Sequence, residues 1–401
     1  KVLNVPHLRF PEFSGEWEEH TLSEYLEFKN GLNPDAKRIG SGLPFISVMD
    51  ILSEGVINYD NIRGKVNATE KEIECFGVKD GDLLFQRSSE TLEDVGRANV
   101  YMDNRTAIYG GFVIRGRKIG NYDPLFFKYL LATPLARKRT CRMGAGAQHF
   151  NIGQEGLSKI SLYFPSIEEQ RKIAEFLSLI DERIATQNKI IEDLKKLKSA
   201  ISKYLFARKD LLETTICLSN IATLKNGYAF QSGKYNALGK WKILTITNVP
   251  GERYINDEDC NCIINLPNDI QDHQVLKEGD ILISLTGNVG RVSLCKNGNY
   301  LLNQRVGLLQ LAKNVNQEFL YQILSSQRFE NSMIACGQGA AQMNIGKGDV
   351  ENYVLPYSSN GNNILFAAKI LHSYDECIIN ELRRLTLLTM QKQYLLTQMF
   401  I

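Results

Sequence analysis

The sequence predicts an α+β protein in which two tandem-duplicated, β-rich domains are separated by two long helices. These helices are expected to form an antiparallel coiled coil with pseudo-two-fold symmetry. Two observations lead to this fold class. Segments from the first half of the chain return in the second half in the same order. Each half also ends in a long helical pattern whose apolar residues recur at 4-3 spacing.

The clearest repeated segment is a Gly-rich decapeptide, GAGAQHFNIG at 144–153 and GQGAAQMNIG at 337–346, with six identical positions. LSEYLEFKNG from Leu22 returns as LSNIATLKNG from Leu218, and VKDGDLLF returns as LKEGDILI. All offsets stay between 191 and 198 residues, which indicates a duplication of about half the chain. The halves agree at turns and apolar positions and differ elsewhere, so we expect a shared fold with different targets.

Each half begins with short β-type runs broken by Gly, Asn and Asp, such as GDLLF and GDILISL. A helix follows in each half. Asp123 is the expected N-cap and Pro124 the first helical residue of YDPLFFKYLLATPLARKR, and Asn316 is the expected cap of NQEFLYQILSSQRFE. The decapeptide and a short strand ending at Pro165 or Pro356 complete each half.

A long helical pattern then begins, the first running roughly from Ser166 to Phe206. Its line at 4-3 spacing consists of Ile173, Leu177, Ile180, Ile184, Gln187, Ile191, Leu194, Lys198, Ile201 and Leu205. Adding 194 gives Ala367, Leu371, Tyr374, Ile378, Glu381, Leu385, Leu388, Lys392, Leu395 and Met399. Both lines are interrupted by polar residues at the same two places, which favours a paired coiled coil. The alternative is two unrelated helices, each packed on its own domain.

These patterns divide the chain into four segments. They are an N-terminal arm with the first domain (1–165), a central helix (166–209), the second domain (210–357) and a C-terminal helix (358–401).

Composition is that of an ordinary globular protein, with 43% hydrophobic and 23% charged residues. There is no apolar run of about 18 residues to span a membrane. The eight cysteines show no CxxC spacing, which suggests reduced thiols and a cytoplasmic location. A net charge of +2 argues against a wholly basic nucleic-acid coat, but it permits a local basic surface such as ARKRTCR at 136–142.

No catalytic motif is convincing. DPLFF at Asp123 is similar to the D-P-P-Y/F stretch of amino-methyltransferases, but Leu125 replaces the second proline and no glycine-rich cofactor loop exists. Helix capping explains the stretch better. P-loop, G-x-S-x-G and metal-ligand spacings are absent from the sequence. His149 has no counterpart in the second decapeptide, which argues against a catalytic role.

The loops instead carry the side chains that reach base edges and phosphates. The turn after GDLLFQ reads RSSETLEDVGR in the first half and SLTGNVGR in the second, and Lys-Asn-Gly turns add a cation to each half. The alternative is that such loops simply connect strands. The residues expected to bind DNA are Lys29, Asn30, Arg87, Ser88, Ser89, Arg97, Gln148, His149 and Asn151, then Lys225, Asn226, Thr286, Asn288, Arg291, Gln338, Gln342 and Asn344.

Over essentially all 401 residues, the chain resembles the DNA specificity subunit of type I restriction–modification systems. The resemblance rests on GDLLFQRSSETLEDVG, GDILISLTGNVGR and the two decapeptides. Its most specific part is FPSIEEQRKIAEFLSLIDERIATQNKIIEDLKKLK, from Phe164, with Glu169-Gln170 near the start of its helical pattern. It implies two target recognition domains joined by the antiparallel helices, each reading one half of a split double-stranded DNA target with an unspecified spacer.

The resemblance also implies a bacterial or archaeal chain without catalysis, cofactor or metal of its own. Two modification subunits would bring S-adenosylmethionine and methylate adenine N6, and two restriction subunits would bring ATP and Mg. The helix residues expected to bind partners are Glu169, Gln170, Ile173, Ile180, Ile184, Ile191, Leu194, Ile378, Leu385 and Leu388. The second copy, LPYSSNGNNILFAAK, lacks the EEQRKIA form.

Two other functions stay open on the sequence. A coiled-coil assembly protein could use its β-rich domains to bind protein instead of DNA. A methyltransferase acting by itself would need the cofactor loop that the sequence lacks.

Overall fold

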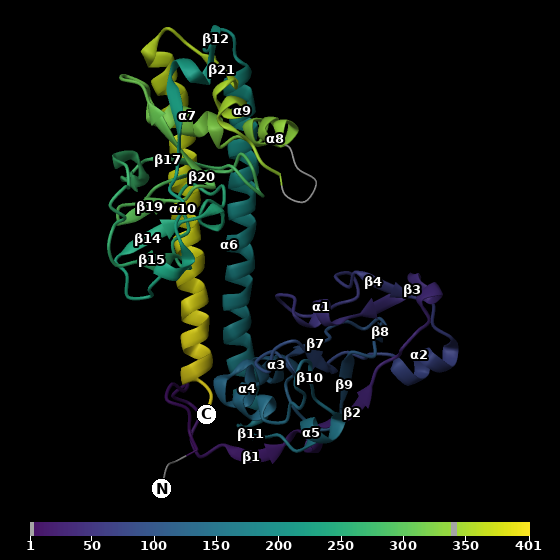
Figure 1. The fold of residues 1–401 in the computed structure, drawn as a ribbon. Coiled ribbons are helices and arrows are strands. Elements are labelled where there is room, and N and C mark those ends of the chain that lie inside the picture. Colours follow the sequence, from purple (N-terminus) through teal and green to yellow (C-terminus); the bar gives the residue numbers. More distant parts are fainter. Residues whose placement is uncertain (1–3, 338–342) are drawn as a thin grey trace. The chain divides into compact units, whose positions relative to one another are not determined.

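The computed structural model describes residues 4–337 and 343–401. The chain folds into two compact units (Figure 1). Unit 1 comprises the chain up to Asn188 together with the segment from Arg384 onward, and unit 2 comprises Lys189–Arg383. Two long helices, α6 (Ile167–Ala207) and α10 (Gly361–Gln398), therefore contribute residues to both units. Each unit thus contains one β-rich domain and part of each long helix, and the predicted α+β class is confirmed.

The strands of unit 1 are β1 (Glu18–Thr21), β2 (Leu26–Asn30), β3 (Ile39–Ile46), β4 (Gly64–Val66), β5 (Leu83–Gln86), β6 (Ser88–Ser89), β7 (Ala98–Val100), β8 (Ile108–Tyr109), β9 (Val113–Lys118), β10 (Phe150–Asn151) and β11 (Ser161–Phe164). Its short helices are α1 (Val48–Ile51), α2 (Glu70–Phe76), α3 (Pro124–Ala132), α4 (Pro134–Cys141) and α5 (Gln154–Ser158).

The strands of unit 2 are β12 (Thr214–Cys217), β13 (Ala222–Asn226), β14 (Trp241–Leu244), β15 (Asn261–Ile263), β16 (Val275–Leu276), β17 (Ile281–Ser284), β18 (Val292–Leu294), β19 (Tyr300–Leu302), β20 (Val306–Leu311) and β21 (Val354–Tyr357). Its short helices are α7 (Gln317–Leu324), α8 (Gln327–Cys336) and α9 (Lys347–Glu351). Single 3-10 turns lie at Leu22–Glu24, Ala36–Arg38, Leu218–Asn220, Ser232–Lys234, Ile246–Asn248 and Asp272–Gln274.

The two domains share one topology, as the sequence repeat predicts. The four-stranded sheet has the order β2-β9-β5-β7 in unit 1 and β13-β20-β17-β18 in unit 2, with every pair antiparallel. The pair β1–β11 in unit 1 corresponds to β12–β21 in unit 2. A second sheet has the order β4-β3-β8 in unit 1 and β15-β14-β19-β16 in unit 2. The duplication is therefore a duplication of fold.

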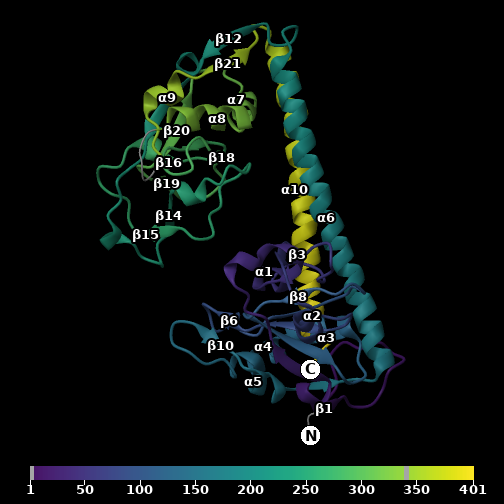
Figure 2. The same cartoon turned by 90° about the vertical axis from the view of Figure 1, so that its right-hand side faces the viewer.

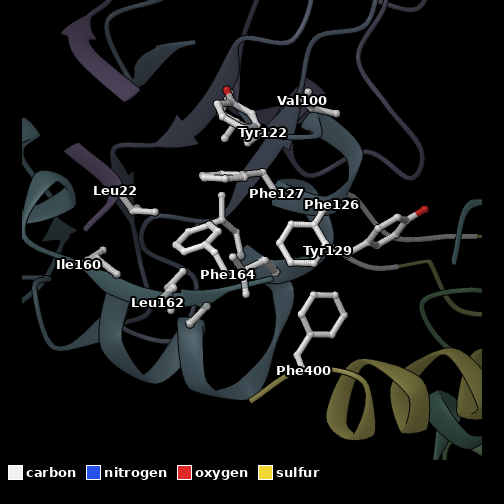
Figure 3. Packing of buried hydrophobic residues seen from close by; sticks show 14 of the residues in the cluster. Leu22, Val100, Tyr122, Phe126, Phe127, Tyr129, Ile160, Leu162, Phe164 and Phe400 are labelled. Carbon is white, nitrogen blue, oxygen red and sulfur yellow. The ribbon is translucent and has the colours of Figure 1, made fainter. Parts of the chain in front are cut away.

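Successive side chains of the central strands point to opposite faces of the four-stranded sheet, so that each face carries a hydrophobic core. In unit 1, Phe85 belongs to a cluster with Phe126 and Phe127 of α3, while its neighbour Leu84 belongs to a different cluster. The end of α10 joins the first cluster, and Figure 3 shows Phe400 beside Phe126, with ring centroids 5.4 Å apart. Residues from the end of the chain therefore complete the core of unit 1.

The predicted caps are confirmed, but the helices they begin are shorter than predicted. The side chains of Asp123 and Asn316 accept hydrogen bonds from Phe126 and Phe319, as N-caps do. YDPLFFKYLLATPLARKR forms two helices because Thr133 caps a second one at Pro134, where a continuous helix would lose a backbone bond. NQEFLYQILSSQRFE is likewise divided, and Ser326 caps its second helix.

Within each unit, the segments of α6 and α10 lie side by side and antiparallel (Figures 1 and 2). Most residues of the predicted 4-3 lines are buried or half-buried. Of the polar interruptions, Lys392 of α10 pairs with Asp181 of α6 in unit 1, and Lys198 of α6 pairs with Asp375 of α10 in unit 2, each over 2.5 Å. Since Lys392 and Asp375 are Lys198 and Asp181 shifted by 194, the two ion pairs are reciprocal copies, and the predicted coiled coil is confirmed within each unit.

Candidate nucleic-acid interface

In unit 1 the fold brings together the two polar segments that the sequence singles out. β6, just after β5, pairs with β10 of the decapeptide, so that Ser88 lies opposite Asn151. The Ser88 hydroxyl donates to the Asn151 side-chain oxygen, and the Ile152 N–H donates to the carbonyl oxygen of Arg87 over 3.0 Å. Ser88, Ser89 and Asn151 are thus placed on one small two-stranded surface.

Unit 2 repeats this junction, with Thr286 in the place of Ser88 and an asparagine kept in the place of Asn151. Thr286 forms a β-bridge with Asn344, the Gly287 N–H donates to the carbonyl oxygen of Met343 over 2.8 Å, and the Ile345 N–H donates to that of Leu285 over 3.0 Å. Asn288 is exposed beside this bridge. The backbone bond from Ile345 to Leu285 matches the bond from Ile152 in unit 1, so the junction is a property of the repeated fold.

A buried side chain holds the turn in both units. The Gln86 amide donates to the carbonyl oxygen of Ser88 over 2.9 Å, and the Ser284 hydroxyl donates to that of Thr286 over 3.2 Å. Gln86 and Ser284 occupy the same strand end, and both are buried. Two different polar residues therefore fix the same backbone turn.

The tip of the first decapeptide is a narrow hairpin. Ala145 and Asn151 exchange two backbone hydrogen bonds of 2.9 Å, and Gln148 and His149 are exposed at the tip between them. Gly146 has a φ of +142°, and a Cβ there would lie 1.9 Å from the carbonyl oxygen of His149, so only glycine fits. The predicted residues Gln338 and Gln342 of the second decapeptide lie outside the described residues.

Two of the predicted cations are already paired with carboxylates. Arg97 contacts Asp94 over 2.6 Å, and Arg291 contacts Glu330 over 3.4 Å. A hydrogen bond from the Thr91 hydroxyl, followed by the charge of Arg97, lowers the pKa of Asp94 below its usual value. The carboxylates reduce the positive charge that Arg97 and Arg291 can offer to phosphate.

The structure corrects the prediction of turns at the two Lys-Asn-Gly motifs. Their Lys and Asn residues end strands instead of forming turns. Lys29 and Asn30 are the last residues of β2, and Lys225 and Asn226 are the last of β13. The Lys29 ammonium contacts the Cys75 sulfur over 2.9 Å.

The turns themselves begin at the glycines that follow. A Cβ at Gly31 would lie 2.1 Å from the carbonyl oxygen of Gly110, and one at Gly227 would lie 2.2 Å from that of Asn303. Close backbone approach therefore accounts for the repeated glycine.

Glu169 and Gln170, expected to bind partners, have internal uses in unit 1. Arg9 of the N-terminal arm forms two bonds of 2.8 Å to the Glu169 carboxylate, which is 1% exposed. Gln170 accepts from the backbone N–H of Asp123 and donates to the carbonyl oxygen of Pro165. This Glu-Gln pair therefore fastens the arm and the start of α3 to α6.

The other helix residues expected to bind partners face inward to different degrees. Ile173, Ile180, Ile191 and Ile378 are buried, and Ile184, Leu194, Leu385 and Leu388 are half-buried. The apolar side chains that α6 and α10 expose lie off the predicted lines. In unit 1, Leu179 and Leu387, 52% and 64% exposed, line a groove of about 630 Å³ together with Glu182, Arg183, Thr186, Gln187, Arg384, Leu388 and Gln391.

Three residues at the interface were not predicted individually. Arg137, within the predicted basic stretch 136–142, donates to the carbonyl oxygens of Glu93 and Val95 and so supports the turn after β5. Burial lowers its pKa. Phe112 and Arg305 stand just before β9 and β20, and their backbones bond to Arg87 and Leu285. The repeat aligns Phe112 with Arg305. Because these two residues differ in type, the repeat did not identify them as equivalent functional residues.

Among the described residues, no three His, Cys, Asp or Glu side chains gather as they would around a metal ion. Within the same part of the chain, none of the helices has the length and apolar character needed to cross a membrane.

Comparison with known proteins assigns the repeat. The sequence pattern of the type I restriction modification DNA specificity domain matches residues 14–196 and again 213–389. The type I restriction enzyme MjaVIII specificity subunit of Methanocaldococcus jannaschii is 25% identical over 354 residues, which cover 81% of this chain and 78% of that protein. The putative MjaX specificity subunit of the same organism is 24% identical over 377 residues, covering 89% and 86%.

Solved structures agree on the fold. The crystal structure of the type I restriction–modification S subunit from M. genitalium has a TM-score of 0.59 at 17% identity and covers 99% of both chains. A second structure, which concerns the structural basis of complex assembly and conformational transition of the type I R-M system, has a TM-score of 0.57 at 14% identity. The match covers 95% of this chain and 96% of that one. With two matches of the domain pattern spanning most of its length, the chain belongs to the type I restriction–modification DNA specificity family.

Proposed function

We propose that this chain is the non-catalytic DNA-reading subunit of a type I restriction–modification enzyme. Unit 1 reads one half-site of a bipartite, asymmetric duplex target and unit 2 reads the other. Two adenine-N6 methyltransferase subunits, each carrying S-adenosylmethionine, assemble on the chain, and restriction subunits with ATP and Mg join them in the holoenzyme. The methyltransferase subunits flip the target adenine out of the stack, and this chain supplies only the position.

The observation that carries the proposal is the duplicated junction between the turn after β5 or β17 and the decapeptide. The Ile152–Arg87 backbone bond of unit 1 recurs as Ile345–Leu285 in unit 2, and an asparagine stands at the junction in both, Asn151 or Asn344. The residues around it differ, with Ser88 and Ser89 in unit 1 and Thr286 and Gly287 in unit 2. A backbone junction that is kept while the residues around it change is what reading two different half-sites requires.

The helices support the assembly part of the proposal. Their exposed apolar side chains, such as Leu179 and Leu387 at the groove of unit 1, offer apolar surface for a partner helix. The reciprocal ion pairs Lys392–Asp181 and Lys198–Asp375 give the two helical segments related local structures, which suits two copies of one partner.

The decisive experiment compares adenine methylation across the genome in cells with and without the gene. We expect one split sequence motif to lose methylation when the gene is deleted and to regain it on complementation. The purified chain alone should not methylate or cleave DNA. Activity of the isolated chain, or an unchanged methylation pattern, would contradict the proposal.

The modular part of the proposal is tested by paired substitutions. Replacing Gln148 and Asn151 by Ala should disturb one half-site, with a loss of about 1–3 kcal/mol per base contact. Replacing Gln342 and Asn344 should disturb only the other half-site. Sequencing of methylated sites distinguishes the two, and an effect of either pair on both half-sites would refute the modular reading.

The spacer is tested by lengthening α6, which contributes to both units. Four residues inserted between Ile184 and Ile191 add about 6 Å and about 40° of rotation. One base pair adds about 3.4 Å and about 35° of twist. The twists match for one added pair, while the lengths favour nearer two. Because a mismatch in rotation turns a recognition loop away from its groove, we expect the same half-sites with a spacer one pair longer, and a spacer two pairs longer is the alternative. An unchanged spacer would mean that α6 does not set the distance.

Salt dependence separates this function from that of a scaffold that binds only protein. Phosphate contacts release counterions, so the affinity of the chain for duplex DNA should fall steeply as salt rises. Absence of duplex binding at low salt would favour the protein-binding alternative.

A further inference from the structure

The four-stranded sheet of unit 1 ends beside the candidate interface in a single backbone contact. The last registered pair of β5 and β9 is Gln86 with Val113. One residue beyond it, the Arg87 N–H donates to the carbonyl oxygen of Phe112 over 2.9 Å. Because the Arg87 carbonyl also accepts the bond from Ile152, Phe112 adjoins the place where the turn and the decapeptide meet.

Unit 2 has the same contact with other residues. The last pair of β17 and β20 is Ser284 with Val306, and the Leu285 N–H donates to the carbonyl oxygen of Arg305 over 3.1 Å. The Leu285 carbonyl accepts from Ile345, as that of Arg87 accepts from Ile152. We call the contacts Arg87–Phe112 and Leu285–Arg305 the ladder ends.

Each ladder end has one residue, Phe112 or Arg305, whose side chain is exposed to solvent and does not pack into the core. Phe112 is 69% exposed, whereas Val113, the next residue, is fully buried. Arg305 is exposed and Val306 is buried. Within the described part of the chain, the Arg305 guanidinium has no ion-pair partner, unlike Arg291 nearby in the sequence, which contacts Glu330. Phe112 lines a pocket of about 410 Å³ together with the exposed side chains of Ile39 and Met49. Because an exposed apolar patch is typical of an interaction site, this surface points to an external contact.

The arginine and the apolar residue of the ladder end change places between the two units. In unit 1 the cation, Arg87, stands after β5 and the apolar residue before β9. In unit 2 the apolar residue, Leu285, stands after β17 and the cation before β20. Each unit therefore has one arginine at this place, from opposite strands of equivalent ladders. The Arg87 guanidinium donates to the carbonyl oxygen of Gly111 over 3.3 Å, whereas Arg305 is exposed. A position-by-position comparison of the repeats hides this exchange, because it aligns each arginine with an apolar residue.

We propose that the residue before β9 or β20 is a base-reading position in each domain, occupied by Phe112 in the first and Arg305 in the second. This rests on the proposed function and names residues that it does not include. Phe112 contacts the methyl group of a thymine, as apolar side chains do in the major groove. Arg305 donates to O6 and N7 of a guanine, the bidentate contact that a free guanidinium makes best.

The chain offers a matched control at the far end of each strand. Ile119 follows β9 and is 60% exposed, so Ile119→Ala removes an exposed apolar side chain at the other end of the strand that Phe112 precedes. Lys313 follows β20 and is exposed, so Lys313→Ala removes the same charge as Arg305→Ala. Neither control residue lies at a ladder end.

The experiment uses the full-length chain in cells that contain its modification partner. Methylated sites are sequenced for the wild type, Phe112→Ala, Arg305→Ala and the two controls. Binding of each full-length variant is then measured on duplexes carrying the wild-type target and every single-base change in it. If deletion of the gene leaves the methylation pattern unchanged, the proposed function fails. If the wild type behaves as proposed, the variants test this inference separately.

Phe112→Ala should weaken binding to the wild-type target about tenfold, the usual scale of one base contact. It should abolish base preference at one position of the half-site read by unit 1 and leave the other half-site unchanged. Phe112→Leu, which keeps an apolar side chain, should retain the preference, and Ile119→Ala should behave as the wild type. An unchanged preference in Phe112→Ala, or the same change in Ile119→Ala, would overturn the assignment.

Arg305→Ala should abolish preference at one position of the half-site read by unit 2, while Lys313→Ala should not. A contact with phosphate would give a different result, namely equal loss on every sequence and a salt slope smaller by about one. That outcome would assign Arg305 to the DNA backbone and refute its role in reading a base.

Discussion

The two units attach their domains to the long helices through equivalent aspartates, and they do so differently. In unit 1, Asp181 of α6 accepts from Lys392 and from the Tyr129 hydroxyl at 2.9 Å, and its side chain is 21% exposed. In unit 2, Asp375 of α10 accepts from Lys198, Arg253 and Gln322, and its side chain is 7% exposed. The aspartate–lysine pair is common to both, and only the contact with the domain has changed.

The difference arises from the domain side. Gln322 occupies the place in α7 that Tyr129 occupies in α3, and Arg253 comes from the segment before β15. Arg253 also forms two bonds, of 2.9 and 2.7 Å, to Glu318. Burial alone would raise the pKa of Glu318, but hydrogen bonds from Arg253 and Gln322 hold it below its usual value. Unit 2 thus has a buried ionic network where unit 1 has a tyrosine.

This comparison teaches that the duplicated helices keep one ion pair as a fixed element while each domain is attached by its own contacts. A domain can change its sequence, and hence its target, provided that it still supplies a donor to the helix aspartate. The two tryptophans of the chain allow each attachment to be measured separately, since Trp17 lies in unit 1 and Trp241 in unit 2. Trp241→Phe leaves a probe for unit 1, and Trp17→Phe leaves one for unit 2.

The largest effect is expected from Asp375→Ala. It leaves the positive charges of Lys198 and Arg253 in a buried place without their shared acceptor, which should cost unit 2 roughly 3–5 kcal/mol in its free energy of unfolding. Urea unfolding followed by Trp241 fluorescence measures the loss, and Trp17 fluorescence is the control for unit 1. A loss below 1 kcal/mol would mean that Glu318 alone satisfies Arg253.

Asp181→Ala should cost unit 1 less, about 1–2 kcal/mol, because the half-exposed Lys392 can turn to water and one neutral hydroxyl bond is lost. The same titration followed by Trp17 fluorescence tests this. Equal losses for Asp181→Ala and Asp375→Ala would contradict the distinction drawn between the two attachments.

Tyr129→Phe isolates the contribution of the domain in unit 1. It removes the hydroxyl bond to Asp181 but keeps the buried ring and the pair with Lys392, so we expect a loss of about 0.5–1.5 kcal/mol. In an Asp181→Ala background the same substitution should have little effect. If the double variant loses the sum of the free energies that Tyr129→Phe and Asp181→Ala lose singly, the hydroxyl does not act through Asp181.

The smallest effect is a pH dependence confined to unit 1. Burial lowers the pKa of Lys128 to about 8, although the charge of Asp181 opposes the shift. An unfolded lysine has a pKa of about 10.4, so the unfolded chain binds more protons above pH 8 and the free energy of unfolding should rise with pH in this window. Lys128→Met should remove that rise. The difference between the wild-type and Lys128→Met curves cancels the other titrating groups, and identical slopes would refute the prediction.

The sequence predicts features that depend on neighbours along the chain or on an exact repeat. The 4-3 lines, their polar interruptions and the caps at Asp123 and Asn316 are such features, and all are seen in the structure. The repeat also indicated that the turn after GDLLF and the decapeptide serve one purpose, although it did not show that Ser88 lies opposite Asn151.

Features made by tertiary contact could not be read in this way. The ladder ends depend on which strands pair, and the network around Arg253 depends on a segment where the two halves differ. The Lys-Asn-Gly motif was misread because its glycine is required by a neighbouring backbone that lies nearly 80 residues away in each half. Glu169 resembled a partner-binding residue because the sequence gives no sign that Arg9 reaches it.

The contribution of the end of α10 to unit 1 has a consequence for how the protein is made. Trp17 packs edge-on against Phe400, and both belong to one core with Phe126. A ribosome must therefore synthesise unit 2, a continuous stretch of chain, before Trp17 and Phe126 can make their contacts with Phe400. During that time the surface of unit 1 that Phe400 later covers stays exposed. A chain interrupted between unit 2 and Phe400 would therefore hold a whole second unit beside a first unit whose core lacks one of its aromatic rings.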